Sequence, residues 1–315
     1  MALESIVLRD PATGSTAKIL PGFGFNCYSF QPVVAGEAIE VLWSVPDFDS
    51  GQQRPSHSGI PLLFPFPGRL GGTQFTFGGK TYNLEAADGR GNAIHGFVLN
   101  RPWQVVEQSA TRIVGRFHAS QVDRAILDHW PADFCLTVTY ELSGGKLAST
   151  IDVHNPDTKP LPFGLGTHPY FRLPLGKSGQ RDECRVTVPV SEFWPLENML
   201  PTGKTQPATG EKNLAHGLRF ADTKLDDVFS GLPQTSGLQQ ATIADPGSGR
   251  TLRVSFSNHF RAVVVYNPPH REAICIEPYS CIPDYFRLGE LGVDTSMVLL
   301  QPNQSIQYRV DIELS

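Results

Sequence analysis

The chain has 315 residues, of which 40% are hydrophobic and 10% aromatic, enough to bury a large core without disulfides or a structural metal. Its 26 basic and 31 acidic residues are well mixed and give a net charge of −5. No run of Lys or Arg exceeds a pair, so the sequence lacks the basic patch that binding to phosphate backbones requires. Nucleic acid is therefore excluded as an expected partner.

The cysteines and the N-terminal residues bear on where the protein resides. Cys27, Cys135, Cys184, Cys275 and Cys281 are odd in number and scattered, and none forms a C-x-x-C pair. This distribution is typical of free thiols in a reducing compartment, so we expect a cytoplasmic protein. Residues 1–18 lack the apolar run of a signal peptide, and no apolar stretch is long enough to span a membrane. We expect no membrane partner.

Alternation of apolar and polar residues predicts that most elements are strands. The longest alternating runs are Phe134–Leu142, Leu147–Val153 and Ser305–Ile312. Helical periodicity is confined to Val122–Trp130, which Pro131 ends. Shorter candidate strands, in chain order, are Ser5–Leu8, Val105–Val106, Ile113–Phe117, Arg185–Val188, Leu252–Phe256, Ala262–Tyr266 and Ile274–Ile276.

Frequent turns separate these strands. The chain holds 30 Gly and 26 Pro, and it lacks the long helical stretches that a βαβ protein needs between its strands. The pattern predicts an all-β protein, either a sandwich or a barrel. Pro201–Gly210 resembles a linker, but strand patterns flank it on both sides. We therefore predict a large loop there, within a single domain that spans residues 1–315.

Common motifs for nucleophilic, nucleotide and metal chemistry are missing. There is no G-x-S-x-G elbow, no P-loop and no dinucleotide-binding glycine pattern. The nine histidines contain no H-x-H or H-E-x-x-H arrangement. We therefore expect neither a cofactor nor a metal ion.

Several polar residues instead lie in short segments rich in glycine, proline and aromatic residues. Glycine and proline fix the backbone, aromatic rings offer flat apolar surfaces that suit a sugar, and a His or carboxylate held between them can transfer protons. The segments are Gly59–Arg69, His95–Phe97 with Arg101–Trp103, Phe163–Phe171 around His168, Leu225–Phe229 with Asp226 and Asp227, and Glu277–Asp284.

Each of these residues also has a purely structural interpretation. His168 and His95 fit turns, and Asp226 and Asp227 fit loop caps. Arg69 fits a surface position that closes a proline-rich turn. Glu277 follows the apolar run Ala273–Ile276, and a carboxylate at the end of a strand ordinarily turns toward solvent.

Taken together, the segments resemble those of the aldose 1-epimerase family, in the same order over nearly the whole chain. Gly59–Arg69 is similar to its G-x-P-x-x-F-P-x-x-x-R segment, and His95–Phe97 to its H-G-F segment. The most specific match is Asn155 followed by Pro162–Phe171, similar to N…P-F-G-x-G-x-H-P-Y-F. The aspartate segment Leu225–Phe229 and the glutamate segment Glu277–Asp284 follow, and Trp194 with Leu200–Gly203 resembles W…L-P-T-G.

The resemblance implies a large antiparallel β-sandwich, of the galactose mutarotase-like kind, with a sugar bound in a cleft on one sheet. It implies that Glu277 is the general base and His168 the general acid. His95 would act beside them, and Arg69 with Asp226 or Asp227 would bind the sugar. Such an enzyme opens the ring at C1 and closes it on the other face, which needs one carboxylate, one imidazole and no cofactor. The expected partner is a small sugar, bound by a monomer or homodimer.

The sequence departs from the family pattern at three positions. Arg172 and Arg287 stand where the family often has asparagine, and Gly68 replaces an asparagine before Arg69. Additional arginines would favour a phosphorylated or acidic sugar, so a hexose-6-phosphate 1-epimerase is one alternative. A carbohydrate-binding protein without catalysis is the other, because a fold alone does not fix function.

Overall fold

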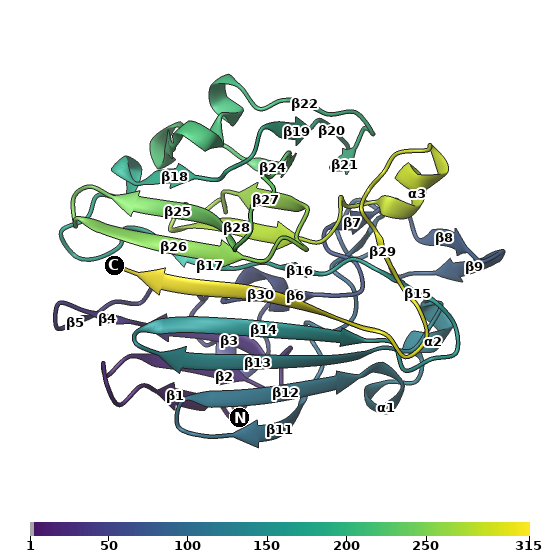
Figure 1. Ribbon diagram of the computed structural model, residues 1–315, viewed down its shortest axis with the longest axis horizontal. Coiled ribbons are helices and arrows are strands. Elements are labelled where there is room, and N and C mark those ends of the chain that lie inside the picture. Colours follow the sequence, from purple (N-terminus) through teal and green to yellow (C-terminus); the bar gives the residue numbers. More distant parts are fainter. Residues whose placement is uncertain (1–2) are drawn as a thin grey trace.

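The computed structural model describes residues 3–315, and its two large antiparallel sheets pack face to face (Figure 1). Nine strands form the first sheet, in the order β11 (Gln104–Gln108), β12 (Arg112–His118), β13 (Cys135–Ser143), β14 (Lys146–His154), β30 (Ser305–Leu314), β26 (Arg250–Phe256), β25 (Gln239–Asp245), β18 (Arg185–Thr187) and β23 (Leu218–Arg219).

The second sheet has eight strands and carries the features that matter for function. Its order is β22 (Gln206–Pro207), β19 (Glu192–Trp194), β24 (Asp226–Ser230), β27 (Ala262–Tyr266), β28 (Ala273–Tyr279), β16 (Gly166–Thr167) and β6 (Leu62–Leu63), with β17 (Tyr170–Arg172) also pairing with β28. These two sheets confirm the predicted all-β sandwich.

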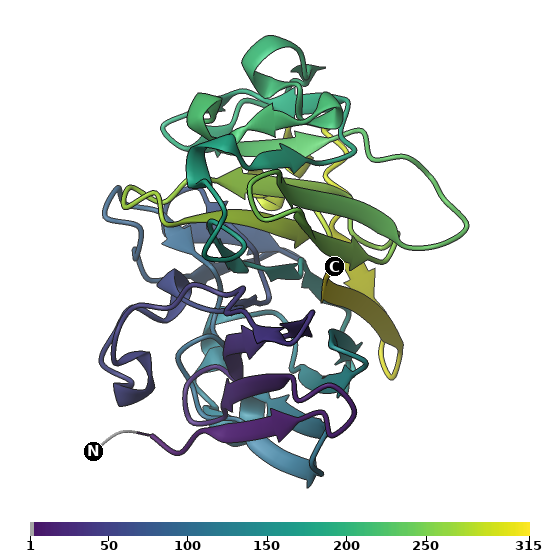
Figure 2. The same ribbon diagram turned by 90° about the vertical axis from the view of Figure 1, so that its left-hand side faces the viewer.

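Smaller elements surround the two sheets. They are the three-stranded sheet β1 (Ile6–Arg9), β2 (Thr16–Leu20) and β3 (Asn26–Gln31), and the pairs β4 (Val33–Val34) with β5 (Glu37–Ala38), β7 (Arg69–Leu70) with β10 (Ala93–Ile94), β8 (Gln74–Phe77) with β9 (Lys80–Asn83), β15 (Leu161–Phe163) with β29 (Val298–Leu300), and β20 (Leu196–Glu197) with β21 (Leu200–Pro201). Figure 2 shows the N-terminal strands toward one end of the molecule and the green segments toward the other.

Helices are short. The helices are α1 (Ala119–Val122), α2 (Ile126–His129) and α3 (Tyr285–Glu290), with 3-10 turns at Phe48–Ser50, Pro55–His57, Arg181–Glu183, Gly210–Lys212, Leu214–His216 and Phe220–Asp222. The helical window Val122–Trp130 is thus divided into two single turns, because Asp123 adopts an extended backbone and its carboxylate is held by Arg101. No helix among residues 3–315 is long and apolar enough to cross a membrane.

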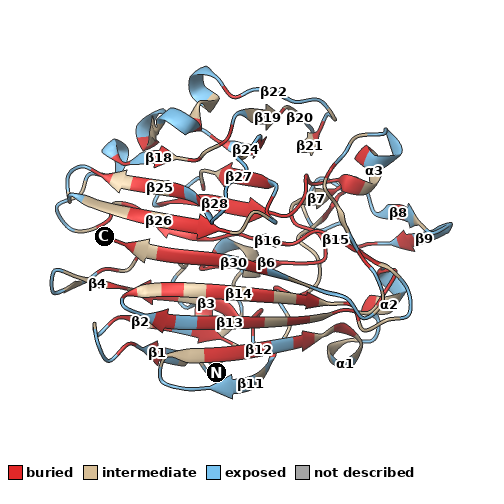
Figure 3. Cartoon of the chain, in the orientation of Figure 1, coloured by how far each residue is buried: buried red, intermediate tan, exposed pale blue. Residues whose placement is uncertain are grey.

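The core lies between the two large sheets. The longest predicted runs, now β13, β14 and β30, alternate buried and less buried residues along most of their length, as a sheet with one covered face requires. Figure 3 shows that burial concentrates in the central strands and that exposed residues gather in the outer hairpins and loops. Apolar residues of β27 and β28, such as Val263, Val265, Ile274 and Ile276, pack in the same core cluster as Val254 and Ile312 of the facing sheet.

Strand β28 is buried on both of its faces along its whole length. Its inward face belongs to the core, and on its outward face Ala273 and Cys275 pack against Tyr170. The segment Pro201–Gly210, predicted to be a large loop, contains the two-residue strand β22. This strand pairs with β19 at the edge of the sheet. The assignment of residues 1–315 to one domain stays a prediction.

Candidate active site

A cleft of about 210 Å³ opens on the outward face of the eight-stranded sheet. It is formed by side chains that point away from the core on β24, β27 and β28, by Arg69 of the short strand β7, and by the loops that carry His95 and His168. The six residues that line it and bear directly on chemistry are Arg69, His95, His168, Asp226, Tyr266 and Glu277. Five of these six were identified from the sequence.

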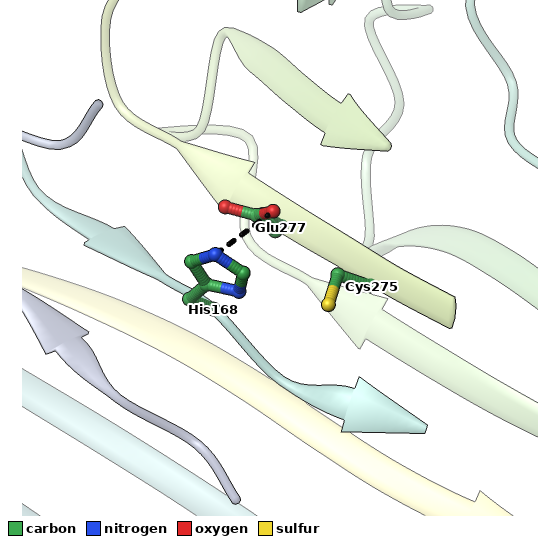
Figure 4. A group of neighbouring side chains, drawn as sticks. All are labelled: His168, Cys275 and Glu277. Carbon is green, nitrogen blue, oxygen red and sulfur yellow. Dashed lines mark ion pairs between the residues drawn. The ribbon is translucent and has the colours of Figure 1, made fainter. Parts of the chain in front are cut away.

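The strand register explains why Glu277 and His168 meet. Gly166 of β16 lies opposite Tyr279 of β28, and Tyr170 of β17 lies opposite Cys275. Continuing that register through the gap between β16 and β17 places His168 opposite Glu277. Opposed residues of antiparallel strands project to the same face with Cβ atoms about 5 Å apart. Accordingly, His168 Nε2 lies 3.4 Å from Glu277 Oε1 (Figure 4).

Glu277 is in the interior of the sheet rather than turned toward solvent. It is 1% exposed and lies within β28, which continues to Tyr279. The prediction that the strand ends before Glu277 is wrong. Strand β28 pairs with β17 up to Cys275 and with β16 at Tyr279, and Pro278 lies between these two paired segments. Tyr279 Oη donates a hydrogen bond to Glu277 Oε2 at 2.7 Å. Burial raises the pKa of the Glu277 carboxyl well above its usual value, although the Tyr279 hydrogen bond lowers it.

His168 is held by its backbone and by an aromatic neighbour. Its backbone N–H donates to the carbonyl of Pro61 at 2.9 Å. Its ring is parallel to the Tyr170 ring, with centroids 4.9 Å apart. Burial lowers the pKa of His168 to about 3. In the ligand-free cleft the imidazole is therefore neutral, and the shifts of both pKa values favour the uncharged forms of the pair.

His95 lines the cleft beside His168. Its ring centroid is 5.6 Å from that of His168, and its Nδ1 is buried with no hydrogen-bond partner among the described residues. Burial lowers the pKa of His95 well below its usual value, and the nearby His168 and Arg69 lower it further. A neutral imidazole with a free ring nitrogen can donate to or accept from a sugar hydroxyl.

The glycine after His95 allows this loop to approach the sheet. Gly96 has a φ of 73°, and a Cβ atom at this position would lie 2.0 Å from the carbonyl oxygen of Phe64. His95 itself adopts a φ of 67°, and its backbone N–H donates to the carbonyl of Gly68. The His-Gly sequence thus forms a tight turn, as one interpretation of the sequence expected. The same turn brings the His95 side chain to the cleft.

Arg69 is fixed by Asp88, a residue that the sequence analysis did not identify. Arg69 Nε donates to Asp88 Oδ2 at 3.0 Å, and the Asp88 side chain is fully buried. Burial raises the pKa of Asp88, but hydrogen bonds from Asn92, the Arg90 backbone and Arg69 together lower it to about 2. Asp88 therefore stays ionised and orients the guanidinium group in the cleft wall.

Only one of the two adjacent aspartates points into the cleft. Asp226 of β24 lies opposite Tyr266 and lines the cleft, whereas Asp227 lies opposite Val265, whose side chain belongs to the core cluster. Asp227 Oδ2 accepts a hydrogen bond from Lys212 Nζ at 2.5 Å. Asp227 thus projects away from the cleft, because neighbouring residues of a strand project to opposite faces. Of the two alternatives, the structure brings only Asp226 to the cleft.

The two unusual arginines lie outside the cleft wall. Arg287 binds the Asp284 carboxylate and the carbonyl of Pro201. Arg172 ends β17, and its Nε is buried without a partner among residues 3–315. Neither lines the cleft. Gly68 has a φ of 66°, and a Cβ there would lie 2.9 Å from Pro283 Cγ, so an asparagine at this position would require Pro283 to shift.

Three tyrosines of the site were missed from the sequence. Tyr170, Tyr266 and Tyr279 line the cleft. Tyr170 and Tyr279 lie two residues after His168 and Glu277, respectively, so strand alternation could have assigned them to the same face. Tyr266 ends a predicted strand, but nothing local in the sequence indicates which face it takes.

Comparison with solved structures defines the class of protein. A galactose mutarotase-like protein of Clostridium acetobutylicum superposes with a TM-score of 0.87 at 24% identity, covering 100% of this chain and 99% of the other. A GalM/aldose epimerase homologue of C. elegans gives a TM-score of 0.81 at 19% identity, with 99% of each chain covered. The fold is that of the galactose mutarotase-like proteins.

Sequence comparison gives the family. The aldose 1-epimerase family model matches residues 4–313, so the chain belongs to the aldose 1-epimerase family, whose members are isomerases that act on carbohydrates. YihR of Escherichia coli is 27% identical over 235 residues, which cover 72% of this chain and 71% of YihR. LacX of Lactococcus lactis is 24% identical over 274 residues, covering 83% and 85%, respectively.

The close approach at Gly96 predicts a specific loss of stability. Gly96→Ala introduces both an unfavourable positive φ, costing about 1–2 kcal/mol, and a collision with Phe64, costing about 1–3 kcal/mol more. Gly72 is the matched control because its φ is 74° and its Cβ position is open. Urea unfolding should show that Gly72→Ala loses only the first contribution. Equal losses in the two variants would contradict this account of the turn.

Proposed function

We propose that the protein is an aldose 1-epimerase that interconverts the α and β anomers of a neutral aldohexose. The observation that carries the proposal is the pairing of Glu277 and His168, 3.4 Å apart, in a cleft large enough to admit a small molecule. General acid–base catalysis requires two such groups within reach of one substrate, one able to accept and one able to donate a proton.

The chemistry balances within this pair. With the proton on His168, the Glu277 carboxylate takes the proton of the C1 hydroxyl, the bond between C1 and the ring oxygen breaks, and the ring oxygen takes the proton from His168. The product is the open-chain aldehyde, with Glu277 protonated and His168 neutral. After rotation about the C1–C2 bond, the reverse transfers close the ring on the other face, and both protons return.

Burial determines which protonation form of the pair is favoured. The carboxylate–imidazolium form and the neutral form have the same net charge, so ring opening moves a proton without creating a net charge in a buried site. The pKa of Glu277 is raised and that of His168 is lowered by burial, which favours the neutral form. Ring opening therefore starts from the less favoured carboxylate–imidazolium form and ends in the neutral form, which accompanies the open-chain sugar.

The remaining cleft residues are suited to holding the sugar. Arg69, oriented by Asp88, donates hydrogen bonds from a fixed position, and Asp226 at the mouth of the cleft accepts them. His95, with its free Nδ1, completes a set of polar groups that face the catalytic pair. We propose that these three side chains bind the sugar hydroxyls.

The placement of Arg172 and Arg287 removes the argument from sequence for a hexose 6-phosphate, and we propose a neutral sugar. Arg287 is already bound to Asp284, and neither Arg287 nor Arg172 lines the cleft. A protein that only binds carbohydrate would need hydrogen-bonding and aromatic groups, but it would not need a carboxylate buried against an imidazole. The free thiols are consistent with the cytoplasmic location that we propose.

Polarimetry or NMR of freshly dissolved α-glucose and α-galactose tests the proposal. We expect the purified protein to accelerate anomer equilibration, and to do so after exhaustive chelation, because the proton transfers need only side chains. Activity that is lost on chelation and restored by a divalent ion would contradict the proposed mechanism. Faster equilibration of glucose 6-phosphate alone would favour the sugar-phosphate epimerase.

Glu277→Gln isolates the base because it keeps the size and the hydrogen bond from Tyr279 but cannot accept a proton. We expect turnover to fall by about 10²-fold or more, because a positioned base contributes about 10²–10⁴-fold. Thermal unfolding should show a folded protein. Turnover near that of the wild type would place the base elsewhere.

The two aspartates provide a comparison on adjacent residues. Asp226→Asn should lower kcat/KM about 10–100-fold, because a hydrogen bond to a charged group contributes about 1.5–3 kcal/mol. Asp227→Asn should change kcat/KM by less than about threefold, since the Lys212 pair that it breaks is worth about 0–1 kcal/mol. Steady-state kinetics of both variants decides, and the opposite ranking would transfer the binding role to Asp227.

A further inference from the structure

A third side chain that the proposed reaction does not use lies beside the catalytic pair. Cys275 is fully buried on β28, two residues before Glu277, and therefore projects to the same face. One ligand atom from each of His168, Cys275 and Glu277 lies within 4.8 Å of the other two. Figure 4 shows the thiol and the carboxylate on one strand, with the imidazole facing them from the neighbouring segment.

We propose that His168, Cys275 and Glu277 form a zinc-binding site, and that bound zinc inhibits the epimerase. The three groups supply one nitrogen, one sulfur and one oxygen, the donor types that Zn²⁺ takes in proteins. Three protein ligands leave a fourth tetrahedral position, and two of the three ligands, His168 and Glu277, line the cleft.

The distances require only a small contraction. Zinc–ligand bonds of about 2.0–2.3 Å place tetrahedral ligand atoms about 3.3–3.6 Å from one another. The His168 Nε2 to Glu277 Oε1 distance is already 3.4 Å. The three ligand atoms lie within 4.8 Å of one another, so the thiol needs to approach by at most about 1.5 Å, a distance that a side-chain rotation about the Cα–Cβ bond of Cys275 can cover.

Charge favours a dication in this position. Zinc binding displaces the thiol proton of Cys275 and the carboxyl proton of Glu277, and the resulting site holds Zn²⁺ with one thiolate and one carboxylate. The net charge is zero, so the buried anions are compensated. Cys281, which is also fully buried, lacks this arrangement, because its neighbours are Gly164 and Tyr285 rather than a histidine and a carboxylate.

Inhibition follows because the metal and the reaction use the same groups. A zinc-bound Glu277 cannot accept a proton, and a zinc-bound His168 has no proton to donate at the coordinating nitrogen. This consequence rests on the proposed epimerase function, whereas metal binding itself does not.

Cobalt substitution tests the site independently of activity. Co²⁺ titrated into the purified wild-type protein should give the near-ultraviolet absorption band of a thiolate–cobalt bond and the visible bands of tetrahedral cobalt, and Zn²⁺ should abolish both. Cys275→Ala should lose the thiolate band, and Cys275→Ser provides the same test with a side chain of nearly unchanged size. Cys184→Ala, which removes an equally buried thiol outside the cleft, should keep the band.

Anomer equilibration provides the second measurement. Zn²⁺ should inhibit the wild type and Cys184→Ala, and chelator should restore activity. In Cys275→Ala the inhibitory concentration should rise about 100-fold or more, since even outer partners of metal ligands contribute about 10–100-fold. Absence of the thiolate band from the wild-type protein would overturn the proposal. So would equal inhibitory Zn²⁺ concentrations for the wild type and Cys275→Ala. A thiolate band in a protein that does not equilibrate anomers would support the zinc site and contradict the epimerase function.

Discussion

The structure depends on the burial of one carboxylate, that of Glu277, in the middle of a β-sheet and opposite an imidazole. An isolated buried charge is strongly unfavourable, so the carboxyl group needs partners in fixed positions. Tyr279 donates to one of its oxygens, and His168 faces the other. The pair can carry its single proton on either member without a change in net charge, and the proposed reaction, in which a proton passes through a bound sugar and returns, uses this property.

The sandwich provides the rigidity that such a pair requires. Strand β28 is paired on both edges, its inward face packs in the core, and its outward face forms the floor of the cleft. The segment that pairs with β28 changes from β16 to β17 at His168. His168 therefore keeps its place opposite Glu277, while its backbone N–H donates to the carbonyl of Pro61. The close contact of Gly96 with Phe64 holds the loop of His95 against this arrangement. Packing outside the cleft thus fixes the distances between the side chains that line it.

Much of the fold and most of the site could be predicted from the sequence, and the exceptions have physical causes. Runs with one face in the core and one toward solvent, such as β13, β14 and β30, show the alternation that identifies strands. Strand β3 was missed because it is buried on both faces and shows no clear period. Strands β2 and β25 were also missed, and in β25 buried positions are taken by Gln239 and Asp245, which hide its alternation in the sequence. Glu277 was expected at a strand end because the apolar run Ala273–Ile276 stops before it, whereas β28 continues to Tyr279 and changes its partner from β17 to β16 around Pro278. The choice between Asp226 and Asp227 depends on register, which a single sequence does not fix.

The central claim is that Glu277 and His168 act as one catalytic unit. Exchange NMR at anomeric equilibrium measures the interconversion rate directly for wild type, Glu277→Gln, His168→Asn and the double variant. The account predicts that each single substitution lowers the rate about 10²-fold or more and that the double variant is no slower than the slower single variant, because residues that act as a unit are not additive. Losses that multiply in the double variant, to about 10⁴-fold, would show that the two residues act independently and would contradict the account.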